Sequence, residues 1–370
     1  MRASSASTRV IAWLAVSELQ PELIDVRPDE RFDEAKVADY LRGKLEGVEG
    51  PLTVRQFGGG HANLTYLLRF GEGEDAVEYV LRRPPLGPVA ATSHDMNREY
   101  RALSKLWKGF PPAPRAYLYC EDATIIGADF LVMERRHGIV VRGLVPSEFG
   151  AGKDPVANRK LSEVLIDTLV DFHAVEPKSV GLDKLGKPQG FLERQVSGWT
   201  GRYERAKIED APVAEEVARW LADNLPESPP STLVHNDWRL DNMAVAPDDP
   251  GRCVAVYDWD MCTLGDPFCD LGTLLAMWGD RSAGLAAGNP MPTQTEGFMN
   301  REQAAERYAE RAGRDVELLP YYVVFGAFKM AVVLQQIYVR FRRGQTRDER
   351  FAGLGEAAAN LFQLASDRRP

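Results

Sequence analysis

Cysteine and histidine are scarce in this sequence, which contains four cysteines and five histidines in 370 residues. The cysteines stand singly in apolar or strand-like contexts, without the paired spacing that zinc sites need. We therefore predict four reduced residues that pack in the interior: Cys120, Cys253, Cys262 and Cys269.

An excess of positive charge is also absent. The chain carries 54 acidic and 45 basic side chains, a net charge of −9, and this balance argues against a nucleic acid partner. The apolar run over residues 321–341 contains Lys329 and is shorter than a membrane span, so it predicts a buried helix. The first seventeen residues have too short an apolar core for a signal peptide. We expect them to form a helix or tail leading into the domain, with a transit-type segment as the alternative, in a cytoplasmic monomer or homodimer.

The Walker A pattern of phosphate-binding loops is missing, but QFGGGHANLTYLLRF (residues 56–70) places three glycines between two predicted strands. Such a glycine-rich hairpin tip lets backbone N–H groups approach phosphate oxygens. Because the glycines are contiguous and a strand follows them, the segment is not a dinucleotide-binding fingerprint. A flexible hairpin turn without a ligand is the alternative interpretation.

The most informative segment is LVHNDWRLDNMAVAPDDPGRCVAVYDWD, residues 233–260. It places Asp237 five residues before Asn242, and Asp258 directly after the apolar run CVAVY. Phosphoryl transfer needs a carboxylate that orients the attacking hydroxyl, followed by an amide oxygen and a carboxylate that hold Mg²⁺. LVH and CVAVY predict short strands, with the loop NDWRLDN after the first of them. An Asp-rich turn is the structural alternative, and a zinc-type hydrolytic site is disfavoured because no second His or Cys lies nearby.

A phosphate-binding cation and its partner are expected upstream. The strand predicted over residues 76–86 ends in Arg82 and Arg83, which must face opposite sides. We assign the cation to Arg82 and expect Arg83 to face solvent. The helix predicted over residues 94–110 carries Glu99, the expected partner of that cation. Downstream, residues 123–141 predict two strands around a Gly-Ala-Asp turn, ending at a connector against which adenine would lie.

Taken together, the Gly-rich hairpin, VLR strand, REY helix, FLVME strand, HNDxxxDN loop and DWD-x5-GDPFCDL segment resemble the aminoglycoside phosphotransferase family, which includes choline kinases. The sequence is most similar to the branch found fused to, or beside, acyl-CoA dehydrogenases. The match covers roughly residues 50–280. It implies an α+β, two-lobed protein-kinase-like fold with a small β-rich N-lobe and a large, mainly helical C-lobe. The expected divisions are an N-terminal helical extension (1–50), the N-lobe (51–134) and the C-lobe (135–370).

Within the extension, residues 32–47 predict an amphipathic helix whose apolar positions pack on the N-lobe: Phe32, Ala35, Val37 and Leu41. Further helices are expected over residues 160–175, 192–207 and 211–226. The Gly/Pro/Thr-rich stretch 279–297 predicts a mobile loop.

The resemblance also implies roles for single residues in a reaction that uses ATP (or GTP) and Mg²⁺. Asp237 would be the catalytic base or hydroxyl-orienting carboxylate, and Asn242 and Asp258 the metal ligands. His235 would brace the loop, and Asp270 would tie the metal-binding segment to it. Asp260 departs from the family pattern; predicted on the same strand face as Asp258, it would be a second metal contact or a solvated strand end. The nucleotide-binding residues would be Gly58, Gly59, Gly60, Asn63, Arg82, Glu99, Met133 and Glu134.

The acceptor is less well specified than the nucleotide. Candidate lining residues, for which core packing is the alternative, are Arg194, Trp199, Tyr203, Trp238 and Asp266. The basic LASDRRP end argues against an aminoglycoside, and the dehydrogenase-associated branch suggests a hydroxyacyl-CoA or other hydroxyl-bearing metabolite. A protein kinase is disfavoured because only about ten residues follow Asp258 before the next helix, too few for an activation segment. The remaining alternatives are a non-catalytic nucleotide-binding kinase-like module and a true aminoglycoside resistance kinase.

Overall fold

The computed structural model describes residues 22–58, 63–86, 95–208, 211–279, 291–346 and 349–370. Four predictions therefore lie wholly or partly outside the described residues. They concern the first seventeen residues, Gly59, Gly60 and most of the loop predicted over residues 279–297.

The chain divides into two compact units. Unit 1 contains the described residues up to His137 together with Ala255–Cys262, and unit 2 contains Gly138–Val254 and Thr263–Pro370. This division differs from the predicted one in two respects. Residues 22–50 belong to the same unit as the N-terminal sheet, and the segment that carries Asp258 returns to that unit after a long excursion through unit 2.

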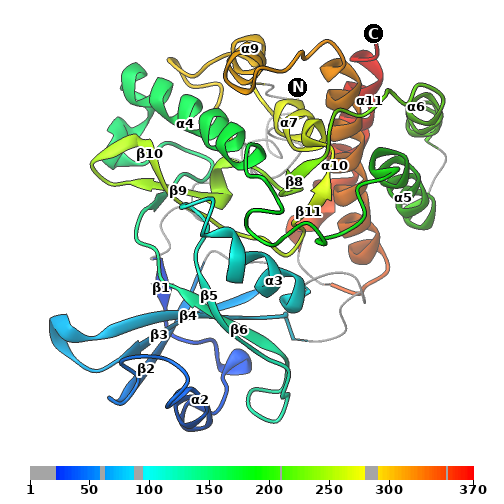
Figure 1. Cartoon of the computed structure of the whole chain (residues 1–370). Helices are drawn as coiled ribbons and strands as arrows, with labels where there is room; N and C mark the ends of the chain where they lie inside the picture. The colour runs from blue at the N-terminus through cyan, green and yellow to red at the C-terminus, as the bar shows by residue number, and fades with distance from the viewer. Residues whose placement is uncertain (1–21, 59–62, 87–94, 209–210, 280–290, 347–348) are drawn as a thin grey trace, which may run out of the picture. The chain divides into compact units, whose positions relative to one another are not determined.

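Unit 1 is built on a six-stranded antiparallel sheet with the order β1-β2-β3-β4-β6-β5 (Figure 1). Its central strands are rich in Val, Leu, Tyr and Phe, whose branched or aromatic side chains suit a pleated surface. The strands are β1 (Leu23–Ile24), β2 (Leu52–Phe57), β3 (Leu64–Phe70), β4 (Val77–Arg83), β5 (Ala116–Cys120) and β6 (Phe130–Glu134). The helices are α2 (Glu34–Leu41) and α3 (Met96–Leu106), with the short η1 (Pro28–Glu30) and η2 (Gly73–Asp75).

Of the two strands predicted around the Gly-Ala-Asp turn, the one before the turn is absent. Residues 123–126 form a turn, and the strand lies earlier, at β5. The Asp122 carboxylate accepts hydrogen bonds from the Thr124 backbone N–H at 2.9 Å and hydroxyl at 2.7 Å, and Gly127 has a left-handed φ of 84°. This local side-chain hydrogen bonding competes with strand pairing despite the two isoleucines of the segment.

The predicted amphipathic helix is present as α2, which is shorter than expected. Asp33 caps its N-terminus by accepting from the Lys36 N–H at 3.1 Å. Val37 and Leu41 are fully buried in a cluster with the strands of the sheet, whereas Ala35 is exposed, contrary to the prediction. α2 therefore packs against β2 and covers one face of the sheet (Figure 1).

The prediction that Arg83 faces solvent is wrong. Its side chain is buried, not solvated. The guanidinium donates to the carbonyls of Ile126 at 2.9 Å and Glu30 at 2.8 Å, and to the Tyr66 hydroxyl at 3.0 Å. Strand alternation correctly places Arg82 and Arg83 on opposite faces, but the N-terminal segment of the same unit covers the second face.

We expect Arg83→Ala to lower the free energy of unfolding by about 2–4 kcal/mol, because two buried carbonyls lose a charged donor. Urea unfolding measures this change. Arg101→Ala, at an exposed position of α3, is the matched control and should cost about 0.5 kcal/mol or less. Equal stabilities of the two variants would contradict the structural role of Arg83.

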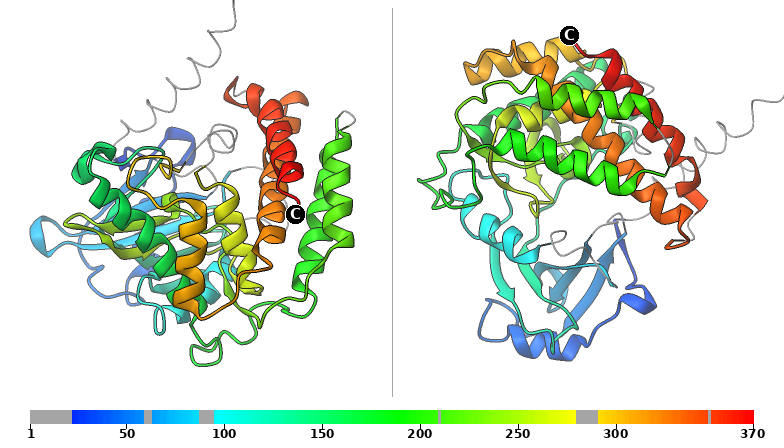
Figure 2. Two further views of the ribbon diagram at one scale, coloured as in Figure 1. Left: turned by 90° about the horizontal axis from the view of Figure 1, so that it is seen from above. Right: turned by 90° about the vertical axis from the view of Figure 1, so that its right-hand side faces the viewer.

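Unit 2 is mainly helical, and its elements are easiest to follow in Figures 1 and 2. The long helix α10 packs against α11, α7 and α5. The helices are α4 (Pro155–His173), α5 (Phe191–Ala206), α6 (Pro212–Asp223), α7 (Pro267–Ala276), α9 (Arg301–Ala312), α10 (Leu319–Arg342) and α11 (Leu354–Asp367), with the short η3 (Ser147–Gly152), η4 (Leu240–Asn242) and η5 (Glu349–Gly353). The strands form two small sheets, β10-β9-β7 and β11-β8, from β7 (Ile139–Val140), β8 (Thr232–Val234), β9 (Met243–Ala246), β10 (Asp249–Val256) and β11 (Thr263–Gly265).

The apolar run of residues 321–341 forms α10, and the helix is longer than its sequence suggested. At 24 residues, with a mean hydropathy of 1.5 in its most apolar window, it is long and apolar enough to cross a membrane. Of that window, 67% is buried inside unit 2, as in the core helix of a soluble protein. The prediction of a buried helix is thus confirmed, while the statement that the run is shorter than a membrane span is corrected.

Helices α7 and α10 cross at glycines, which brings their backbones close together. A Cβ atom on Gly272 would lie 2.4 Å from Tyr322 Cβ, and one on Gly326 would lie 2.6 Å from Thr273 Cα. Neither contact is sterically allowed, so only glycine fits at this crossing. The close approach sets the spacing between the two helices whose side chains reach the HNDxxxDN loop.

All four cysteines are free thiols. Cys120, Cys262 and Cys269 are buried as predicted, and Cys253 is half-buried.

Candidate active site

In unit 1 the structure joins three of the predicted residues into one ion-pair group. Arg82 comes from the end of β4, Glu99 from the first turn of α3, and Asp258 from the turn after β10. The Arg82 guanidinium donates to Glu99 Oε1 at 2.8 Å and, through its other terminal nitrogen, to Asp258 Oδ1. The predicted pairing of Arg82 with Glu99 is thus confirmed.

Local sequence explains this geometry. The register of the sheet sets Arg82 opposite Thr65 on β3, on the face away from Arg83. Asp95 caps α3 by accepting from the Arg98 N–H at 2.9 Å, which fixes the start of the helix one turn before Glu99. Glu99 is fully buried on the apolar side of α3, although its residue type is usually exposed.

The charges of this group do not balance. Burial raises the pKa of Glu99 to about 8; Arg82 opposes this effect, and the carboxylates of Asp260 and Asp258 add to it. Burial alone would lower the pKa of Arg82, but the surrounding carboxylates raise it above the usual value. Glu99 Oε2 and Arg82 Nε are buried without hydrogen-bond partners in the described part of the chain. One guanidinium thus faces three carboxyl groups, and burial disfavours the ionised form of Glu99 among them.

The turn after β10 differs from the predicted strand end. β10 ends at Val256, and Asp258 has a left-handed φ of 68°, a conformation that Asp tolerates better than most residues. The prediction that Asp258 and Asp260 lie on the same strand face is therefore wrong. Asp260 accepts a hydrogen bond from Asn63 Nδ2 at 3.3 Å. The fully buried Trp259 anchors the turn by donating its indole N–H to the Val256 carbonyl at 2.7 Å.

In unit 2 the predicted catalytic loop follows β8. Asn242 Nδ2 donates to Asp237 Oδ2 at 2.8 Å and to the Asp237 carbonyl at 2.9 Å. The backbone N–H of Asp237 donates to His235 Nδ1 at 3.2 Å, so the fully buried His235 braces the loop as predicted. Both hydrogen bonds of Asn242 use its amide nitrogen, and its amide oxygen therefore points away from the Asp237 carboxylate.

Asp270, in the first turn of α7, holds the backbone of this loop. Its carboxylate accepts from the backbone N–H groups of His235 at 2.6 Å and Asn236 at 2.7 Å. It also lies 3.3 Å from His173 Nε2, whose Nδ1 is 2.9 Å from the Tyr308 hydroxyl. Burial alone would raise the pKa of Asp270, but His173 and the N–H of His235 hold it below its usual range. The carboxylate is therefore ionised and fixes two consecutive peptides of the loop.

Two residues around the loop were not among the predicted site residues. His173 lies at the end of α4, and Lys329, in the middle of α10, donates to the Asn236 carbonyl at 2.7 Å. The signal for Lys329 was a lone lysine within a long apolar run, where a charge has a large desolvation cost unless it is partnered.

Most of the predicted acceptor residues have core roles instead. Trp238 is buried, donates its indole N–H to the Leu165 carbonyl at 3.0 Å and stacks on Phe172 at 5.7 Å. Tyr203 is buried beside Phe362, with ring centroids 5.4 Å apart. These aromatic positions follow the helical core pattern that was the alternative interpretation.

The other three predicted acceptor residues also make structural contacts. Asp266 is the buried N-cap of α7, where it accepts from the Phe268 N–H at 2.9 Å. Arg194 is exposed and donates to backbone carbonyls of its own preceding loop. Trp199 is buried, and the Arg202 guanidinium lies 4.3 Å from its ring centroid. Of the five predicted acceptor residues, Trp238 also lines a crevice beside Asp237.

A narrow crevice beside Asp237 is a better acceptor candidate. Its volume of about 20 Å³ has room for roughly one water molecule in this conformation. Three of its eight lining residues are methionines, whose flexible side chains adapt readily to a ligand. Its lining residues are Asp237, Trp238, Arg239, Thr273, Leu274, Met277, Met291 and Met330.

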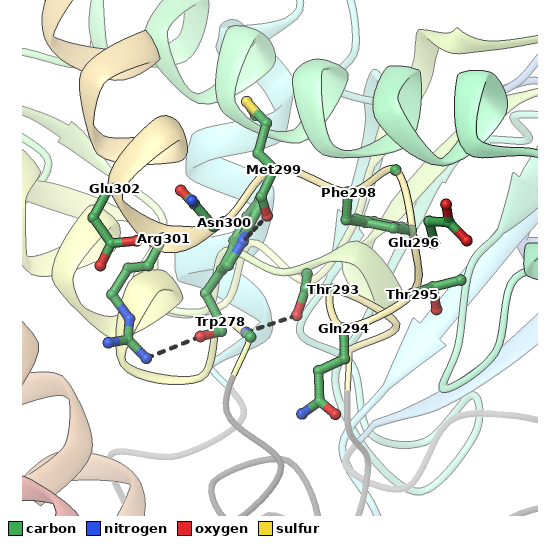
Figure 3. A pocket seen from close by; sticks show the side chains of 12 residues that line it. Trp278, Thr293, Gln294, Thr295, Glu296, Phe298, Met299, Asn300, Arg301 and Glu302 are labelled. Carbon is green, nitrogen blue, oxygen red and sulfur yellow. Dashed lines mark hydrogen bonds between the residues drawn. The ribbon is translucent and has the colours of Figure 1, made fainter.

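A larger cavity of about 630 Å³ lies elsewhere in unit 2 (Figure 3). Hydrogen bonds shape its wall: the Gly279 N–H donates to the Thr293 hydroxyl at 3.0 Å, and Arg301 donates to the Trp278 carbonyl at 3.1 Å. Gly279 directly precedes residues 280–290, which lie outside the described chain, so we assign no ligand to this cavity.

The remaining predicted nucleotide contacts lie in unit 1. Gly58 directly follows β2 and donates its N–H to the Glu22 carbonyl at 3.1 Å. Met133 is buried in β6, and Glu134 accepts from the Arg115 N–H at 3.1 Å. These positions neither support nor oppose an adenine site, because such a site would use backbone groups.

Known proteins resemble this chain over most of its length. The model of the phosphotransferase enzyme family matches residues 53–314. A curated relative, acyl-CoA dehydrogenase family member 11 of Gallus gallus, is 32% identical over 341 residues, which are 90% of this chain and 43% of the relative. The chain thus spans less than half the length of that relative.

Solved structures have the same fold. A candidate aminoglycoside phosphotransferase from Ralstonia eutropha is 27% identical, with a TM-score of 0.76 over 91% of this chain and 98% of that one. A choline kinase from Cryptosporidium parvum is only 8% identical but has a TM-score of 0.56 over 91% of this chain and 95% of that one. The predicted resemblance and the α+β, kinase-like fold class are confirmed. The chain belongs to the phosphotransferase enzyme family.

Proposed function

We propose that this protein transfers the γ-phosphate of ATP (or GTP), with Mg²⁺, to a hydroxyl of a small molecule. The observation that carries the proposal is the buried Arg82 guanidinium held between Glu99 and Asp258. Phosphoryl transfer needs a fixed cation for the phosphates and a carboxylate for the metal, and this group supplies both.

Asp258 and Asn242 would hold the Mg²⁺. Both offer oxygen atoms, which this hard cation prefers, and Mg²⁺ usually takes one or two protein ligands with the remainder from phosphates and water. Among the described residues no cluster of three or more His, Cys, Asp or Glu side chains could hold a metal unaided. When bound, Mg²⁺ would neutralise phosphate charge during transfer.

Asp237 would orient the acceptor hydroxyl and take its proton as the new phosphate bond forms. The hydrogen bond from Asn242 fixes one of its carboxylate oxygens. The backbone of the loop that carries Asp237 is held in place by hydrogen bonds to His235 and Asp270.

The acceptor we favour has an apolar portion, such as a hydroxyacyl-CoA. The support is the methionine-lined crevice, whose wall includes both Asp237 and three methionines. An aminoglycoside is polycationic and would need carboxylates there, but Asp237 is the sole carboxylate among the described residues of that wall. The names of the curated relatives, which are acyl-CoA dehydrogenase family members, point in the same direction.

A phosphate-transfer screen tests the proposal. Purified protein would be incubated with Mg²⁺ and γ-labelled ATP or GTP, and with hydroxyacyl-CoAs, choline-like amines or aminoglycosides. We expect label transfer to a hydroxyacyl acceptor above the rate of hydrolysis, and a thermal shift with Mg·ATP. Nucleotide binding without transfer to any acceptor would favour a non-catalytic module, and transfer to aminoglycosides alone would indicate a resistance kinase.

A further inference from the structure

We propose that Lys329 is a positioning residue for phosphoryl transfer, which orients Asp237 by fixing the peptide unit before it. The inference rests on the proposed function. It concerns a side chain of α10 that is 93 residues from the loop in sequence and that no motif marks.

The placement of Lys329 is unusual for its residue type. It lies in the middle of α10 with only 6% of its surface exposed, and its neighbours along the helix are apolar. Burial lowers the pKa of its ammonium, and the carboxylates of Asp237 and Asp270 oppose that effect. A helix that needed only packing at this position would be better served by leucine or methionine. A specific requirement must therefore offset the desolvation of the charge.

The requirement is to hold the peptide unit between Asn236 and Asp237 in a fixed orientation. Its carbonyl oxygen accepts from Lys329 Nζ at 2.7 Å, and its N–H donates to His235 Nδ1 at 3.2 Å. Because a peptide unit is planar, two such hydrogen bonds fix its orientation and with it the Cα atom of Asp237. Lys329 therefore acts on Asp237 through the peptide unit that precedes it.

Backbone strain makes this clamp necessary. Asn236 has a left-handed φ of 69°, which is unfavourable for a residue with a Cβ atom although Asn tolerates it best. Asp270 holds the peptide on the N-terminal side of Asn236 by accepting its N–H at 2.7 Å. Lys329 holds the peptide on the C-terminal side. With both supports in place the loop keeps the strained conformation that aims Asp237.

Lys329→Met tests the inference, because it keeps an unbranched side chain that is one atom shorter and removes the charge and the donor. We expect kcat to fall about tenfold or more while the KM for ATP changes less than about threefold, since no nucleotide contact is lost. Amide hydrogen exchange, followed by mass spectrometry, should become faster in residues 235–242. Lys329→Gln retains a shorter donor and should give an intermediate kcat.

Tyr321→Phe is the matched control. It also removes one buried hydrogen bond from α10 to a backbone carbonyl, that of Leu221 at 2.8 Å, away from the loop. We expect it to lower stability to a similar degree without changing kcat or exchange in residues 235–242. A folded Lys329→Met protein with wild-type loop exchange and kcat would overturn the inference. If the wild-type protein transfers no phosphate at all, the proposed function fails, whereas the exchange comparison still decides whether Lys329 orders the loop.

Discussion

Asp237→Asn is expected to lower phosphoryl transfer by about a hundred- to ten-thousand-fold, the usual contribution of a general base. The substitution is nearly isosteric, and the Asn242 amide can still donate to the new side-chain oxygen. The loop should therefore keep its structure, and the Kd for Mg·ATP should stay within about threefold of wild type. Single-turnover kinetics and calorimetric titration measure the two quantities separately.

The control for this variant is Asp241→Asn in the same loop. It removes the same charge from a carboxylate that pairs with Arg239, and it should leave transfer within about threefold of wild type. Equal rates for wild type and Asp237→Asn with every active acceptor would remove Asp237 from the mechanism. Equal losses in both loop variants would point to general loop damage instead.

Asp258→Asn is expected to weaken Mg·ATP binding and to reduce turnover on the order of a hundredfold or more, because the metal loses its charged protein ligand. The fold should survive, since asparagine can still accept the hydrogen bond from Arg82. Titration calorimetry with Mg·ATP and circular dichroism would check both statements.

Asp249→Asn, at the start of the same strand β10, changes the net charge equally and should leave nucleotide affinity unchanged. An unaltered Mg·ATP affinity in Asp258→Asn would exclude Asp258 as a metal ligand. Comparison with Asp260→Asn then shows whether the second carboxylate of the turn contributes, since a second metal contact would also weaken binding there.

The elements that carry the site were predictable because their patterns are local. The alternating run LTVRQF identifies β2, apolar residues at helical spacing identify α3, and the spacing of Asp237, Asn242 and Asp258 indicates the chemistry. The pairing of Arg82 with Glu99 was predictable because kinase chemistry requires a helical carboxylate beside the phosphate-binding cation.

The failures involve contacts between distant parts of the sequence. Arg83 was assigned to solvent because nothing in the strand shows that residues 28–41, about fifty positions earlier, cover that face. The supports of the catalytic loop come from His173 and Lys329, which lie 97 and 93 residues from their partners. The acceptor residues were chosen from an aromatic stripe, and such a stripe has the same period whether it faces a core or a pocket.

The glycine crossing of α7 and α10 has a mechanical consequence. Asp270 and Lys329, which grip neighbouring peptides of the loop, stand on these two helices, within three residues of Gly272 and Gly326 respectively. The two glycines thus set the distance between the two helices, and with it the positions of both side chains that hold the loop. A single methyl group at either position would widen the gap and loosen both grips together, so that a change remote from every reacting atom would disable the loop.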